Sequence, residues 1–485
     1  MTRSYKEYAR ELIHLAWPII MGQIGFTFIM AGDVFVAGKY STDVLSAVSI
    51  SGAITSIIFM FGVGLIISVS PVLSNRLGAK KSAKKFFYPT ILFSQIVAFF
   101  SMLLIFATIP LMEHMGFNPK LMPDIKIYTF VFAFSAFGGY LHVGLREFLQ
   151  AYEIVFFPNF ISIIGIFFNL VFNWVFAFGW GAIPAMGAMG LGLASTLIRT
   201  LMGLALLIYC LYYFHFKFEK VSSKYYSSLV KVGLPISVAV SLEFITFNSM
   251  AILMGRVDSI YAAAQNVLGV ISTASFVIPL SISNAIAVKV GFANGAKNLI
   301  DVKRYSITGV ALSVGIMAFC GIFFASFPSF FAKIFTNDAT LIAIVTPIMY
   351  AVACFQCFDG LQVSCGGILK GLKKTFMVSL ANFFGYILVG ISLGAFLAFK
   401  MHLNLLGFWI GIGISSACVG SILVFEIIKT YQKMLNTQVR SNLAFTKFDL
   451  TCVKFRLYYF VQPNAIVICS LGLTAEILEP FGSTT

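Results

Sequence analysis

Charged residues are scarce in this sequence. Only 11% of its 485 residues are Asp, Glu, Lys or Arg, whereas about 25% are charged in an average soluble domain. So few charged side chains leave a water-exposed surface largely uncovered, which excludes an ordinary soluble domain. Hydrophobic residues make up 59% of the chain, and apolar runs of about 20 residues, the length that crosses a bilayer, recur along it. The sequence therefore predicts an integral membrane protein made of helices.

Patterns that bind metals are also lacking. The five histidines are scattered and form no H-x-x-x-H pair, which argues against a membrane metalloenzyme. Cys354 and Cys357 form a C-x-x-C with Cys365 further along, but no histidine or fourth cysteine nearby completes a zinc site. We interpret these cysteines as small apolar packing residues.

Basic residues exceed acidic ones, and the net charge is +15. No aromatic-basic platform or groove-reading motif accompanies this charge, so we expect no nucleic-acid partner. The basic residues lie in short loops between apolar runs, and loops with many of them alternate with loops that have few. By the positive-inside rule the more basic side is cytoplasmic. We expect a multi-pass protein of the inner (plasma) membrane, surrounded by lipid, with both ends of its core in the cytoplasm.

Twelve membrane spans can be placed, all of them helical. They cover roughly 11–37, 43–72, 87–111, 122–145, 156–178, 187–213, 229–254, 259–288, 305–331, 340–366, 376–398 and 404–431. Several exceed the length that crossing requires, which permits tilt.

An internal repeat divides these spans into two sets of six. A shift of 217 residues places Pro18 on Pro235, and Gly78-Ala-Lys80 on Gly295-Ala-Lys297. A shift of 220 aligns the later part of the first half, so that Leu149 falls on Leu369. Because each unit has an even number of spans, both halves face the same way, and a pseudo-twofold axis along the membrane normal should relate two six-helix bundles. The predicted domains are 1–216, a linker at 217–228, 229–432, and a tail of uncertain structure at 433–485.

Acidic residues inside the predicted spans are few, and we single out Asp33, Glu243 and Asp359 among them. A carboxylate at this depth costs about 2.5–3.5 kcal/mol and usually marks an ion or substrate pathway. We expect no basic residue in the middle of a span to neutralise all three. Glu147 and Glu426 lie near span ends, where we expect their side chains to reach the interface.

Asn169 and Asn173 are spaced i, i+4 in the fifth span and so share one helix face. We expect both to approach Asp33 if the first half forms one bundle. Their amides can offer oxygens to a cation or join helices by hydrogen bonds, and the sequence favours neither role.

The sequence resembles the multidrug and toxic compound extrusion (MATE) family over residues 10–432. The resemblance rests on an ordered set of motifs, which includes the Pro-Ile pair that opens each half. The others are Gly-Asp-Val-Phe-Val-Ala-Gly after the first span, Leu-Gly-Ala-Lys-Lys, Leu-Arg-Glu-Phe-Leu-Gln, Phe-Asn-Leu-Val-Phe-Asn-Trp, Met-Gly-Ala-Met-Gly-Leu-Gly-Leu-Ala-Ser, Ser-Leu-Glu-Phe and Phe-Asp-Gly-Leu-Gln-Val.

This resemblance implies a cation-driven antiporter that exports organic, often cationic, compounds. Asp33 matches the acidic position of the family's first span, and Glu243 and Asp359 match acids of its sodium-coupled bacterial branch. Asn173 stands where some relatives have an acid, which weakens the case for a proton-type site in the first half.

We therefore expect a secondary antiporter that works by alternating access and is coupled to Na+ or H+. Glu243 and Asp359 can reach one membrane depth, where their mutual repulsion would favour a bound cation, Na+ or a proton. Small organic cations are the expected substrates. We expect no cofactor beyond the coupling ion, and a monomer. The alternatives are a lipid-linked oligosaccharide flippase of the same superfamily and an integral membrane enzyme.

Overall fold

The computed structural model describes residues 3–214, 223–255 and 257–458. Regular structure in these residues is helical, apart from an isolated bridge between Trp180 and Ile183. The prediction of an all-α fold is confirmed.

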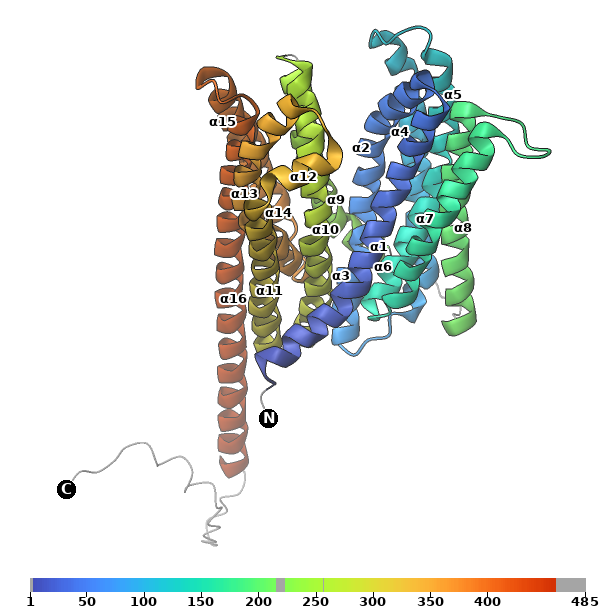
Figure 1. The fold of residues 1–485 in the computed structure, drawn as a ribbon. Helices are drawn as coiled ribbons and strands as arrows, with labels where there is room; N and C mark the ends of the chain where they lie inside the picture. Colours follow the sequence, from blue (N-terminus) through green and yellow to red (C-terminus); the bar gives the residue numbers. More distant parts are fainter. Residues whose placement is uncertain (1–2, 215–222, 256, 459–485) are drawn as a thin grey trace, which may run out of the picture. The chain divides into compact units, whose positions relative to one another are not determined.

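The helices fall into two groups that follow the two halves of the sequence (Figure 1). In the first half they are α1 (Tyr5–Tyr40), α2 (Thr42–Ile67), α3 (Val69–Gly78), η1 (Lys84–Phe86), α4 (Phe87–His114), α5 (Met122–Ala133), α6 (Ser135–Ala151), α7 (Phe156–Phe178) and α8 (Gly187–Phe214). In the second they are α9 (Lys224–Gly255), α10 (Ser259–Gly295), α11 (Leu299–Ser326), α12 (Pro328–Phe335), α13 (Ala339–Gly371), α14 (Phe376–Asn382), η2 (Phe383–Ile391), α15 (Ser392–Ala395), η3 (Phe396–Lys400) and α16 (Asn404–Tyr458).

Eleven helical stretches of the described chain are long and apolar enough to cross a membrane, and α1 is not among them. With 36 residues, α1 is about 54 Å long, enough to carry the predicted first span as well. Four of the eleven stretches join successive helices: α2 with α3, η1 with α4, α5 with α6, and α14 with η2, α15 and η3. With α1, the structure accounts for the twelve predicted spans.

Short polar residues begin several of these helices. The Ser41 hydroxyl accepts a hydrogen bond from the Val44 amide at the start of α2, and the Asp258 carboxylate accepts one from Ile260 at the start of α10. Asp338 caps α13 in the same way. Such caps satisfy amides that have no partner within the helix and are worth about 1 kcal/mol each.

The chain divides into two compact units, residues 1–429 and 430–485. In the second unit the described residues are the continuation of α16 through Tyr458. Within the predicted linker at 217–228, α9 begins at Lys224. Residues 217–222 of that linker lie outside the described chain. The tail beyond Tyr458 lies outside it too.

Backbone conformation supports the internal repeat. Lys80 and Lys297, related by the 217-residue shift, have φ angles of 56° and 57°. Glu153 and Lys373, related by the 220-residue shift, have φ angles of 63° and 58°. Left-handed conformations are uncommon for residues other than glycine, so their recurrence just after corresponding helices shows that the two halves share one backbone plan.

The two halves meet at a reciprocal contact between α3 and α10. A Cβ atom added at Gly78 would lie 1.9 Å from the carbonyl oxygen of Phe292, and one added at Gly295 would lie 1.9 Å from that of Asn75. The 217-residue shift exchanges these two contacts, as a twofold axis requires. Gly291 packs against Ser74, its own equivalent, so the pseudo-twofold axis passes between these two residues.

The basic loops gather around this contact. Asn75 donates a hydrogen bond to the carbonyl of Gly371 over 2.7 Å, and Thr375 donates one to the carbonyl of Val232 over 2.8 Å. We call this region the basic end; it comprises residues 76–85, 224–231, 297–304 and 370–374.

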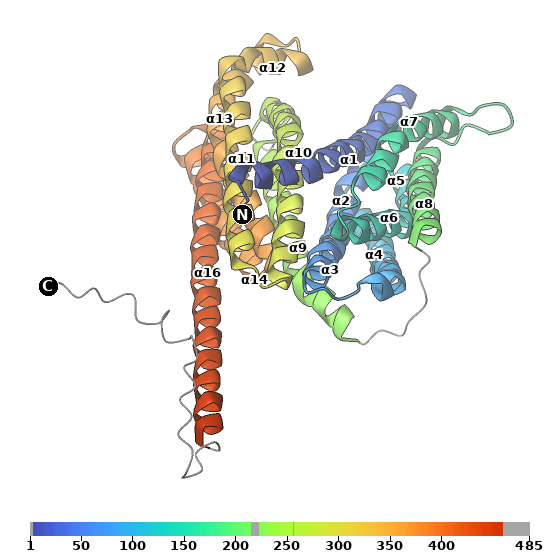
Figure 2. The same ribbon diagram turned by 90° about the horizontal axis from the view of Figure 1, so that it is seen from below.

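Charged side chains add further links between the halves at the basic end. Lys289 of α10 pairs with Glu11 of α1 over 3.2 Å and with Glu153 over 2.8 Å. Tyr8 donates a hydrogen bond to Asp301 over 2.5 Å. Figure 2 shows the start of α1 beside α10 and α11, where these links form. The basic end is therefore closed in this structure.

We predict that Gly78→Ala and Gly295→Ala each destabilise the closed basic end. The added methyl group has no room against a backbone carbonyl, and overpacking of this kind costs about 1–3 kcal/mol. Thermal unfolding of the purified proteins should show a lower Tm for both.

Gly52→Ala and Gly269→Ala are the matched controls. These positions are also related by the 217-residue shift, and nothing lies within 4 Å of an added Cβ. The same substitution there should leave the Tm unchanged or raise it, because alanine favours helix by up to about 1 kcal/mol. An equal decrease in Tm in both pairs of variants would show that the close backbone contact at Gly78 and Gly295 is not the cause of the destabilisation.

Candidate membrane-embedded ion and substrate sites

Asp33 is buried in α1, with 4% of its surface exposed. Its Oδ1 accepts hydrogen bonds from the side-chain amides of Asn169 over 3.2 Å and of Asn173 over 2.7 Å. Its Oδ2 accepts one from the Ser195 hydroxyl of α8. The expected approach of the two asparagines to Asp33 is confirmed, and three donors stabilise the ionised carboxylate.

Glycines allow α1 to come this close to α7. A Cβ atom at Gly25 would lie 2.9 Å from the carbonyl oxygen of Ser162, and one at Gly32 would lie 2.7 Å from Oδ1 of Asn169. Such small residues permit close helix packing in membranes. Gly32 therefore leaves room for the Asn169 side chain of α7, and Asp33 supplies the carboxylate to which Asn169 donates a hydrogen bond.

Arg199 of α8 is buried beside this cluster, although we expected no basic residue in the middle of a span. It is 6% exposed and close enough to Asp33 for the two charges to attract. Its guanidinium carbon lies 4.5 Å from the ring centre of Phe59 and 4.7 Å from that of Phe132. The signal was present in the sequence, since a charge halfway along an apolar run is itself expensive.

A second cluster lies in the other half. Asp359 of α13 is 2% exposed and accepts a hydrogen bond from the amide of Gln362 over 3.1 Å. The same amide also donates a hydrogen bond to the hydroxyl of Tyr386, which is fully buried. Glu243 of α9 is half-buried and near enough to Asp359 for the two carboxylates to repel each other.

This second cluster offers oxygen ligands to a cation. Oε1 of Gln362 is buried without a hydrogen-bond partner among the described residues. Tyr386 belongs to η2, a π-helix, and such wide turns are frequent at functional sites. Two carboxylates and an unpaired amide oxygen suit a hard cation such as Na+, which prefers oxygen, and a proton could serve the same pair of acids.

The two clusters stay separate, and the repeat does not relate them. By the 217-residue shift the repeat equivalent of Asp33 is Met250, and by the 220-residue shift that of Asp359 is Gly139. In the described residues no hydrogen bond or ion pair joins one cluster to the other. The functional roles of the five predicted site residues stay predictions.

Glu147 corrects another expectation. It does not reach the interface but is 1% exposed and pairs with Arg146 over 3.4 Å. Glu426 also has a partner, Lys374, at 3.5 Å. Sequence position near a helix end did not show that other helices cover Glu147.

Comparison with known proteins agrees with this architecture. The MatE family model matches residues 18–175 and 235–396. The probable multidrug resistance protein NorM of Mesorhizobium japonicum is 30% identical over 436 residues, which cover 87% of this chain and 93% of the relative. The multidrug resistance protein NorM of Vibrio cholerae is 27% identical over 434 residues, 86% of this chain and 94% of that protein.

Solved structures show the same fold. The eukaryotic MATE transporter AtDTX14 superimposes with a TM-score of 0.80 at 19% identity, covering 89% of this chain and 98% of that one. The Vibrio cholerae MATE transporter VcmN in its bent form gives 0.79 at 17% identity, with 89% and 98% covered.

Two bundles of membrane helices with buried carboxylates in each define a secondary transporter. The chain belongs to the MatE family, which confirms the resemblance found in its sequence. These relatives favour neither the flippase nor the membrane enzyme as an alternative.

We predict that Arg199→Gln destabilises the protein by about 1–2 kcal/mol, because it removes the cation–π contacts of the buried guanidinium with the rings of Phe59 and Phe132. Part of the loss should come from Asp33, which then keeps its buried charge without an attracting cation. The Tm measured by thermal unfolding should fall clearly below that of the wild type.

A double-mutant cycle with Asp33→Asn isolates the electrostatic part. The cost of Arg199→Gln should be smaller in the Asp33→Asn background, with a coupling of about 0.5 kcal/mol or more. Equal costs in both backgrounds would mean that Arg199 acts through packing alone.

Proposed function

We propose that this protein is a cation-coupled antiporter that exports organic cations from the cytoplasm by alternating access. Its NorM relatives carry the name of multidrug resistance proteins, which supports drugs or toxins as its substrates. The observation that carries the proposal is the pair of neighbouring carboxylates, Glu243 and Asp359, within the membrane-spanning part of the second bundle.

The carboxylate pair supplies a reason for coupling. Two negative charges close together in a medium of low dielectric repel strongly. A Na+ ion or a proton that enters from outside removes this repulsion, and Oε1 of Gln362 can contribute a further ligand. The bound cation and the drug need not touch, provided that they favour different states of the transporter.

Asp33 is the second candidate for cation coupling, or for binding a cationic substrate, together with Asn169 and Asn173. Its charge is stabilised by three hydrogen bonds and by Arg199. In contrast to the Glu243–Asp359 pair, it has no neighbouring acid to repel it among its described contacts. We therefore assign it the weaker tendency to take up a coupling cation.

The closed basic end defines one state of the cycle. With the basic end in the cytoplasm, as the positive-inside rule favours, this state is closed to the cytoplasm. Export then requires the α3–α10 contact and the Lys289 pairs to separate in the opposite state. One charge moved down 100 mV supplies about 2.3 kcal/mol, enough for accumulation of tens-fold. We further propose a monomer of the inner membrane, with no catalytic step and no resident cofactor.

We predict that Glu243→Gln and Asp359→Asn each slow ion-driven efflux by about tenfold or more, a barrier change of about 1.4 kcal/mol. Binding of the drug itself should survive. Proteoliposomes loaded with a fluorescent organic cation, with Na+ and pH gradients imposed separately, measure the rate and identify the ion.

Glu113→Gln is the control, because Glu113 is exposed and pairs only with Lys126 among the described contacts. It should transport like the wild type. If both site variants kept the normal dependence on Na+ and on pH, coupling would have to be assigned elsewhere, with Asp33 next.

Orientation can be tested with single cysteines in a cysteine-free background. A cysteine at Lys80, in the basic end, should resist an impermeant reagent in intact cells, whereas one at Lys39 should be labelled. The reverse pattern would invert the proposed topology.

A further inference from the structure

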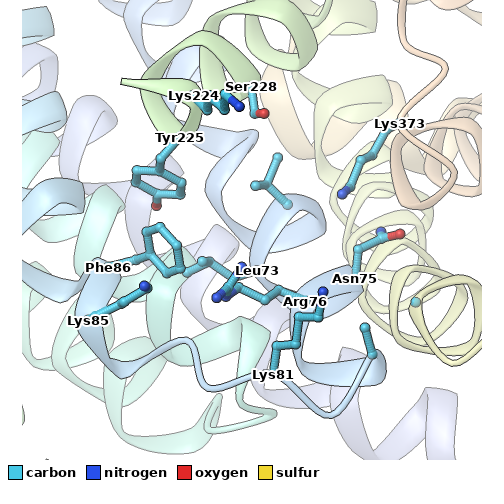
Figure 3. A pocket seen from close by; sticks show the side chains of 13 residues that line it. Leu73, Asn75, Arg76, Lys81, Lys85, Phe86, Lys224, Tyr225, Ser228 and Lys373 are labelled. Carbon is cyan, nitrogen blue, oxygen red and sulfur yellow. The ribbon is translucent and has the colours of Figure 1, made fainter. Parts of the chain in front are cut away.

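A cavity of about 530 Å³ opens at the basic end, away from both carboxylate clusters. Its walls come from α3 and the loop that follows it, from the start of α9, from the end of α10 at Gly295, and from the loop after α13 (Figure 3). Both halves of the protein therefore contribute to it. We call it the basic cavity and define it by its cationic residues Arg76, Lys81, Lys85, Lys224 and Lys373.

The positive charge of this cavity is not neutralised by acidic residues in its lining. None of the described residues that line it is acidic. Arg76, Lys81, Lys85 and Lys373 form no ion pair with any described residue. Partial burial also lowers the pKa of Lys373 from its ordinary value. Like charges held this close repel one another and raise the local concentration of anions.

Arg76 is held in a fixed orientation. Its Nε donates a hydrogen bond to the carbonyl of Ser82 over 2.9 Å, and its guanidinium carbon lies 4.8 Å from the ring centre of Phe86. The terminal nitrogens make no hydrogen bond within the described chain. A guanidinium presented in this way binds the paired oxygens of a phosphate group through two parallel hydrogen bonds.

The positive-inside rule alone does not explain the arrangement. Lys80 and Lys84 lie in the same loop and satisfy that rule equally, yet neither lines the cavity. The 217-residue shift takes Arg76, Lys81 and Lys85 to Ala293, Asn298 and Val302, which are uncharged. The cavity is thus a feature of one side of the pseudo-twofold axis and not a product of the repeat.

We propose that the basic cavity binds a phosphate-bearing anion, and that this anion holds the two halves together at the basic end. Arg76, Lys81 and Lys85 bind it from the first half, and Lys224 and Lys373 bind it from the second. The volume lies within the range of small-molecule sites and has room for a diphosphate or for the headgroup of an anionic phospholipid. The anion stabilises the closed basic end, and its loss leaves repulsion between the halves that favours opening. This inference does not depend on the proposed coupling site.

The test uses the full-length purified protein and two probes with the same chemistry. Inorganic pyrophosphate in detergent solution represents a soluble anion, and nanodiscs of phosphatidylglycerol against phosphatidylcholine represent a lipid headgroup. Sodium chloride at equal ionic strength is the reference for general screening. Binding is followed by calorimetry and by the rise in Tm.

Two double variants of equal charge separate the cavity from its loop. In Lys81→Gln/Lys85→Gln, pyrophosphate affinity should fall by about tenfold or more. Lys80→Gln/Lys84→Gln, which loses the same charge from the same loop, should bind like the wild type. A matching Tm for both variants without ligand establishes that both are folded; should the cavity variant be unstable, Arg76→Gln serves in its place.

Each outcome decides the proposal. A rise in Tm with pyrophosphate identifies a soluble anion, and a rise only in phosphatidylglycerol identifies a lipid headgroup. A response no larger than that to chloride, or an equal loss in both double variants, overturns the site. Hydrogen exchange at residues 69–78 and 288–295 should slow when the anion binds; binding without such protection overturns its role in holding the halves together.

Discussion

The close contact between α3 and α10 constrains the rest of this structure. Gly78 and Gly295 bring the backbones of the two halves together with no space for a side chain. That approach sets the position of the loops that carry the basic residues, and it brings Lys289 within reach of Glu11 and Glu153. A transporter that alternates between states must break this contact, so the affinity of the two halves at this end sets the balance between the states.

One backbone plan carries different chemistry in its two halves. In the first half Asp33 is surrounded by donors and an arginine, which stabilise its negative charge. In the second, Asp359 faces another acid, Glu243, which destabilises the charge of both. The repeat equivalents of Asp33 and Asp359 are Met250 and Gly139, so the two halves differ at the positions of their buried acids. They remain similar in backbone conformation at the turns that follow corresponding helices.

Much of the fold could be predicted from the sequence, because each prediction rests on local properties. Apolar runs of membrane-spanning length, basic loops and repeated Pro and Gly positions gave the twelve spans and the two related halves. The i, i+4 spacing of Asn169 and Asn173 placed both on one helix face, and that face does meet Asp33.

The sequence by itself determined which segments are apolar enough to span a membrane and which acids those segments carry, because hydropathy and helical period are properties of neighbouring residues. Tertiary structure alone decided which charges meet. It placed Arg199 beside Asp33, covered Glu147 with other helices, and brought residues from four distant segments together in the basic cavity. The physical reason is that electrostatic interaction depends on distance in space, and packing between helices sets that distance in a way that no local pattern records.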